Sequence, residues 1–130
     1  SPIPEKDIES FLIQRGLSAE ESKQRALLSQ GSLKRALEWD INLFETIREE
    51  IGVLLKNPDP SHVLALSEKW VEEDEKLEPI LTSLSVLWHQ KTMEGKRIDQ
   101  WEAIQQALKG LNMYANKQLL MESLLFSLVR

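Results

Sequence analysis

The sequence predicts an all-α protein. Its 130 residues contain only five glycines and five prolines, and no stretch alternates apolar and polar residues as a half-buried β-strand does. Apolar residues instead recur every three or four positions, which is the spacing of one face of an α-helix. We therefore expect a short helical segment over residues 1–38, followed by a bundle of about five helices over residues 39–130.

Two short helices are predicted near the N-terminus. The first spans residues 5–15 and is stopped by Gly16. The second spans residues 18–29 and opens with a capping box, because Ser18 is followed three residues later by Glu21.

One long helix is predicted from Ser32 to the break at residues 57–60, Asn-Pro-Asp-Pro. Its apolar positions are Leu37, Ile41, Phe44, Ile47, Ile51, Leu54 and Leu55. In the next helix Asp59 is the expected N-cap and Pro60 the first residue. Its apolar stripe is Val63, Leu66 and Trp70. The acidic residues 72–75 are then expected to form an exposed connection.

Three further helices fill the C-terminal part. The first ends near Gly95 and carries Leu77, Ile80, Leu81, Leu84, Leu87 and Trp88. Asp99 with Glu102 predicts a second capping box, for a helix with the stripe Trp101, Ile104, Leu108 and Leu111. The last helix, residues 116–129, is apolar on nearly every side: Leu119, Leu120, Met121, Leu124, Leu125, Phe126 and Leu128. Such a helix belongs inside a bundle or against another subunit.

Composition excludes several classes of protein. Hydrophobic residues make up 42% and charged residues 28% of the chain, which is ordinary for a soluble domain. Without cysteine there is no disulfide, thiolate zinc site or cysteine nucleophile. The net charge of −5 argues against a dedicated nucleic-acid binder, and no apolar run reaches the roughly 18–20 residues of a membrane span. We expect a cytoplasmic protein and, because the sequence does not begin with methionine, a piece of a longer chain.

The sequence offers no catalytic constellation. Its two histidines, His62 and His89, do not have metal-ligand spacing from other candidate ligands. The acidic pairs at 49–50 and 72–73 lie in stretches typical of solvated helix faces, and no Gly-rich phosphate loop is present. Core packing is the expected role of the four tryptophans, Trp39, Trp70, Trp88 and Trp101. We therefore expect no catalytic residue, no metal and no cofactor.

One short segment carries a local electrostatic cost. Gly31 ends one helical pattern and Ser32 is the expected N-cap of the next. Lys34 and Arg35 then lie in the first turn, where the helix dipole disfavours cations by a few tenths to about 1 kcal/mol. An anion or a partner carboxylate at Ser32, Lys34 and Arg35 would explain this placement. The alternative, that both side chains point into water, stays open.

Two segments resemble a known family. Residues 26–37 resemble the A-x-L-S-x-G-S-x-x-R-A-L stretch in the lid of AAA+ clamp-loader subunits. Residues 111–125 resemble the N-x-N-x-x-L-x-x-E-x-L-L ending of bacterial clamp-loader subunits of DNA polymerase III. The second match rests on Asn116, Leu119, Glu122, Leu124 and Leu125, and Tyr114 stands at the first asparagine of the pattern.

The resemblance implies a fold and a role. Residues 1–38 would be the helical lid remnant of an AAA+ module, and residues 39–130 the helical collar, which in this family assembles five subunits into a ring. The implied partners are the other clamp-loader subunits, delta and gamma/tau, with DNA contacted only through the assembled complex. A free-standing helical adaptor for protein interaction is the alternative from a different class.

The position of the arginine resembles the delta-prime type of subunit. Delta-prime sequences often have G-S-x-G-R-A, which matches Arg35, whereas the ATPase gamma/tau subunits usually have G-S-x-R-D-A. Lys34 departs from both patterns, so the gamma/tau interpretation remains an alternative. Delta-prime subunits generally neither hydrolyse nor need nucleotide, so the resemblance implies a non-catalytic protein.

Overall fold

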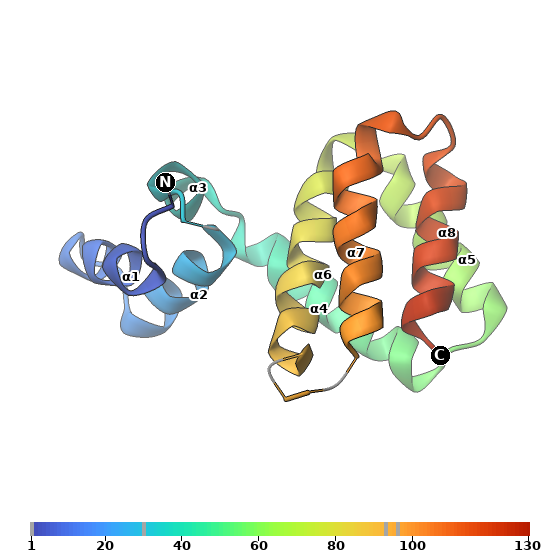
Figure 1. Ribbon diagram of the computed structural model, residues 1–130, viewed down its shortest axis with the longest axis horizontal. Coiled ribbons are helices and arrows are strands. Elements are labelled where there is room, and N and C mark those ends of the chain that lie inside the picture. Colours follow the sequence, from blue (N-terminus) through green and yellow to red (C-terminus); the bar gives the residue numbers. More distant parts are fainter. Residues whose placement is uncertain (1, 30, 93, 96) are drawn as a thin grey trace. The chain divides into compact units, whose positions relative to one another are not determined.

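A computed structural model describes residues 2–29, 31–92, 94, 95 and 97–130, and this part of the chain is helical without a strand. The all-α prediction is confirmed. The α-helices are α1 Glu5–Gln14, α2 Ala19–Ser29, α3 Leu33–Glu38, α4 Ile41–Lys56, α5 Pro60–Glu72, α6 Leu77–Thr92, α7 Ile98–Gly110 and α8 Lys117–Leu128 (Figure 1). Two short 3-10 helices, η1 Asp74–Lys76 and η2 Leu111–Met113, precede α6 and follow α7. The chain divides into two compact units, Ser1–Leu43 and Phe44–Arg130.

The first unit packs α1, α2 and α3 around a small apolar core. Its buried members are Ile8, Leu12, Ala26 and Ala36, with Ile3, Phe11, Leu17 and Leu33 packed against them. The predicted stop of α2 is confirmed at Gly31, whose backbone has a left-handed φ of 86°. The amide of Ile3 donates to the Gly31 carbonyl at 3.0 Å. A Cβ at Gly31 would lie 2.5 Å from that of Pro2, so only glycine fits this turn.

Arg25 joins α2 to the end of α3. Its Nη1 donates to the carbonyls of Ala36 and Leu37 at 3.0 and 3.1 Å, and its Nε donates to the Glu21 carboxylate at 3.1 Å. The last carbonyls of a helix have no partner within the helix and favour a cation. Arg25 in α2 therefore satisfies the last carbonyls of α3. The sequence pattern did not indicate this contact.

The prediction of one long helix from residue 32 to residue 56 is wrong. The chain leaves the helix at Trp39, which has φ −65° and ψ 133°, and α4 begins two residues later. The carboxylate of Asp40 accepts the amide of Leu43 at 3.0 Å. An aspartate that bonds the backbone in this way favours a helix start over a helix interior, so Asp40 divides the segment into α3 and α4.

The second unit is built around α6. Residues 80–86 are all buried, so α6 is more deeply buried than α8. Helix α6 packs against α7, while α8 packs against α5 and α7 (Figure 1). Hydroxyl groups inside α6 bond to the preceding turn, as when Ser83 donates to the Pro79 carbonyl at 2.9 Å. Serine and threonine can therefore lie in this core without unpaired hydroxyls.

The start of α5 follows its sequence signature. Asp59 is the N-cap, Pro60 is the first helical residue, and the Asp59 carboxylate accepts the His62 amide at 2.9 Å. The Ser61 hydroxyl donates to the same carboxylate, and these two hydrogen bonds lower the pKa of Asp59. The predicted stripe is confirmed, because Val63, Leu66 and Trp70 are all buried. The acidic residues 72–75 are exposed as expected.

The predicted start of α7 is wrong by two residues. The helix begins at Ile98 after Arg97, whose backbone is left-handed with φ 58°. Asp99 therefore lies within the first turn, where a carboxylate is favoured by the dipole, and it is not the N-cap. The buried positions of α7 are Gln100, Ile104 and Ala107, so the core-facing stripe is rotated relative to the predicted one, and Trp101 and Leu108 are half-buried.

Candidate functional site

The turn singled out in the sequence has the predicted cap. The Ser32 hydroxyl accepts the Arg35 amide at 3.3 Å, and Lys34 and Arg35 are exposed in the six-residue helix α3. The cap explains why Ser32 stands at this position without any ligand. A contact of Lys34 or Arg35 with an anion or a partner stays a prediction.

Ser32→Ala is expected to lower the free energy of unfolding of the first unit by about 1 kcal/mol, because the amide of Arg35 loses its acceptor. Ser32→Asp is the matched control and should preserve stability, because aspartate is an equally good N-cap. Urea denaturation followed by circular dichroism measures both. Equal stability of the alanine and aspartate variants would contradict the capping role.

The last helix presents apolar residues both to the core and to the surface. Asn116 caps α8, because its side-chain oxygen accepts the Leu119 amide at 2.9 Å, which gives this residue a structural role. The buried residues of α8 are Met121, Leu124, Leu125 and Leu128. Leu119 is 59% exposed, and Met113 and Tyr114, in the connection before α8, are 86% and 50% exposed. We call Met113, Tyr114 and Leu119 the C-terminal apolar surface.

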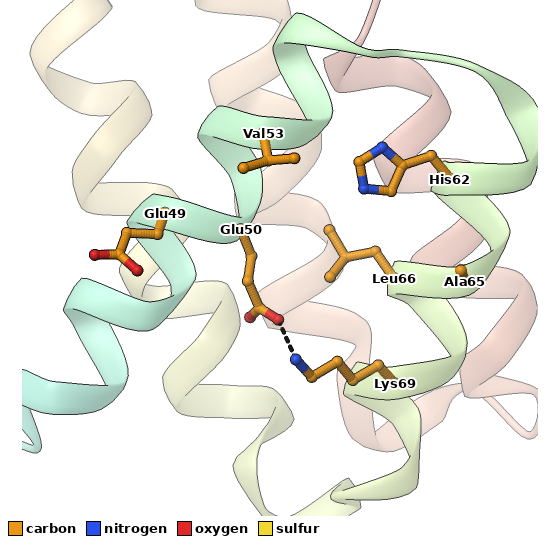
Figure 2. A pocket seen from close by; sticks show the side chains of 7 residues that line it. All are labelled: Glu49, Glu50, Val53, His62, Ala65, Leu66 and Lys69. Atoms are coloured by element: carbon orange, nitrogen blue, oxygen red, sulfur yellow. Dashed lines mark hydrogen bonds and ion pairs between the residues drawn. The ribbon is translucent and has the colours of Figure 1, made fainter.

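An open groove of about 390 Å³ lies between α4 and α5 in the second unit. Its lining residues are Glu49, Glu50, Val53, His62, Ala65, Leu66 and Lys69. Figure 2 shows Val53 from α4 and His62 from α5 pointing toward each other, whereas Glu49 points away from α5. Val53 is 52% exposed although it is apolar. The groove thus exposes the apolar side chain of Val53 beside polar residues.

The carboxylate of Glu50 accepts two hydrogen bonds at the polar end of this groove. Glu50 accepts from Lys69 Nζ at 2.7 Å (Figure 2). It also accepts from the indole Nε1 of Trp70 at 3.1 Å. The hydrogen bond and the charge of Glu50 raise the pKa of Lys69. Since both groups of the ion pair are satisfied, Glu50 and Lys69 hold α4 and α5 together and are poor candidates for acid–base chemistry.

The histidines occupy separate environments. Nδ1 of His62 lies 3.0 Å from the Asn57 carbonyl, to which it must donate because a carbonyl only accepts. The ring of His89 lies 5.8 Å from that of Trp101. Over the described residues, no group of three or more metal-ligating side chains comes together.

Sequence reasoning missed a buried polar network around Gln100. Its Oε1 accepts from the indole Nε1 of Trp88 at 2.9 Å, and its Nε2 donates to the Ser127 carbonyl at 3.1 Å. The network joins α6, α7 and α8. Trp70 and Trp88 are buried as predicted for core residues, whereas Trp39 and Trp101 are half-buried. A glutamine on an amphipathic helix gives no signal in the sequence that distinguishes it from a solvated one.

Comparison of the chain with models of known protein families, with curated proteins and with solved structures finds no match in any of the three. None of the helices, over the residues described, combines the length and the apolar character that crossing a bilayer requires.

Proposed function

We propose that this chain is the C-terminal part of a bacterial DNA polymerase III clamp-loader subunit, most like delta-prime. Residues 1–38 are then the lid remnant and residues 39–130 the collar. The chain acts as a structural and oligomerisation module in the cytoplasm, where it helps to assemble the pentamer that loads the sliding clamp on DNA. It performs no catalysis itself, and it reaches DNA only through the assembled complex.

The C-terminal apolar surface is the observation that carries this proposal. Met113, Tyr114 and Leu119 lie within residues 111–125, the segment that resembles the clamp-loader ending, and all three are at least 50% exposed. Exposed apolar side chains that form a contiguous patch are typical of a surface that contacts a partner. The partners that the resemblance implies are the collar domains of the delta and gamma/tau subunits.

There are two alternatives to this proposal, a gamma/tau subunit and a free-standing helical adaptor. Lys34 departs from both subunit patterns, so a gamma/tau subunit is the first alternative. The open groove at Val53 favours a free-standing helical adaptor, because it offers a second apolar contact surface. A coding sequence for an AAA+ core directly upstream of Ser1 would favour either clamp-loader interpretation over the adaptor.

Mixing the chain with the collar domains of the other clamp-loader subunits is expected to give a complex larger than either component. Light scattering at tens of micromolar measures its mass. Leu119→Glu should weaken the complex, because it places a charge in an apolar contact, and Leu119→Met should preserve it as the matched control. Persistent monomers with every partner tested would contradict the collar proposal and favour the adaptor.

A further inference from the structure

Two cations from opposite sides of the α6–α7 connection contact a hydrogen-bonded pair of side chains, Trp88 and Gln100. Trp88 is only 1% exposed, and its Nε1 donates to Gln100 Oε1 at 2.9 Å. Lys91 Nζ lies 5.1 Å from the centroid of the Trp88 ring. Arg97 Nη1 donates to the same Gln100 oxygen at 3.2 Å. The ammonium and the guanidinium therefore lie against the same Trp88–Gln100 pair.

Neither charge has a carboxylate as a direct partner among the described residues. In the part of the chain that the structure describes, neither Lys91 nor Arg97 forms an ion pair with a carboxylate. Burial, together with the charge of Arg97, lowers the pKa of Lys91 despite the opposing charge of Glu94. Ionisable groups whose pKa is shifted by burial and by a neighbouring charge cluster at functional sites.

The backbone at Arg97 adds a second cost. It is left-handed, with φ 58° and ψ 34°, and Arg97 is the single residue other than glycine with a positive φ among those described. Arginine has no intrinsic preference for this conformation, which asparagine and glycine adopt more readily. A sparsely populated backbone conformation next to a pair of like charges is a recognised feature of binding sites.

We propose that Lys91 and Arg97 bind a phosphate dianion between the ammonium and the guanidinium. A dianion neutralises both cations, whereas a carboxylate neutralises one of them. The guanidinium supplies paired N–H donors for two phosphate oxygens, and the ammonium supplies a compact charge. The exposed Glu94 acts on Lys91 with an opposing charge, which favours a small anion over a long polyanion. This inference is independent of the proposed role in clamp loading.

Titration of the whole chain with inorganic phosphate at low ionic strength and pH 7.5 tests the proposal. NMR spectra of the indole N–H groups should show a saturable shift of the Trp88 signal. Lys91→Gln and Arg97→Asn should each weaken binding by about tenfold, the loss expected for one charge-assisted contact. Asparagine suits the left-handed backbone, so the second variant keeps the fold. Lys109→Gln removes an exposed cation from the same helix and should bind phosphate as the unmodified chain does.

Three comparisons separate this site from general electrostatic attraction. Phosphate should raise the pKa of Lys91, because a bound anion favours the charged ammonium. Acetate at matched ionic strength should bind much more weakly, and an equal effect of acetate would overturn the proposal. Phosphoserine binding as well as phosphate would identify a terminal phosphate group as the ligand, whereas binding of inorganic phosphate alone would identify the free ion. A shift that never saturates, or that survives in both variants, would also overturn it.

Discussion

Leu125→Ala is expected to lower the free energy of unfolding of the second unit by about 2–5 kcal/mol. Leu125 is fully buried in α8, the helix that packs against both α5 and α7. Truncation removes apolar contacts and leaves a cavity that two flanking helices would have to move to fill. Urea denaturation of the whole chain, followed by circular dichroism and by tryptophan fluorescence, measures the change.

Leu119→Ala is the control for this prediction. It makes the same chemical change on the same helix, but Leu119 is 59% exposed, so stability should change by about 0.5 kcal/mol or less. Equal destabilisation by the two substitutions would show that Leu119 is covered in solution. That result would contradict the division of α8 into a core face and the C-terminal apolar surface.

Helix starts were predictable where the signal is local. Ser18, Ser32, Asp59 and Asn116 each cap a helix, with a side-chain oxygen that accepts an amide three residues later. This contact depends only on the neighbouring backbone, so the sequence contains all the information that it needs. For the same reason Gly31 marked a true helix end.

The errors arose where capping signals compete with other preferences. Asp40 lies within an apolar pattern that continues through Leu37, Ile41 and Phe44, and the helical period concealed its role as the N-cap of α4. At Asp99 the capping signal was misleading. Aspartate is a good N-cap residue, but Asp99 lies in the first turn of α7, after the N-cap residue Arg97. Where two neighbouring residues could each begin a helix, the sequence alone does not show which start the tertiary structure stabilises.

Contacts between helices were beyond the reach of the sequence. Arg25 reaches carbonyls eleven and twelve residues away, and Glu50 meets Lys69 across the groove. Lys91 and Arg97 contact the same Trp88–Gln100 pair only because α6 packs against α7. The resemblance pointed to the C-terminal segment, in which the exposed apolar surface lies, but it carried no information about the groove or the cation pair.

Gln100→Leu is expected to destabilise the second unit by about 1–3 kcal/mol for each buried polar group that it leaves unpaired. The leucine side chain has no atom to accept from the Trp88 indole N–H or to donate to the Ser127 carbonyl, which the glutamine now satisfies. Gln100 is 8% exposed, so water replaces these bonds poorly. Gln106→Leu, at an exposed position of the same helix, is the matched control and should change stability by about 0.5 kcal/mol or less.

A second substitution separates the lost hydrogen bonds from the change in shape. Trp88→Phe removes the indole N–H, so the combination of Trp88→Phe with Gln100→Leu should destabilise by less than the sum of the two single variants. The difference measures the coupling between Trp88 and Gln100, because in the double variant neither side chain leaves the other with an unmet donor or acceptor. Strictly additive effects would contradict the network, and would mean that Gln100 contributes through packing alone.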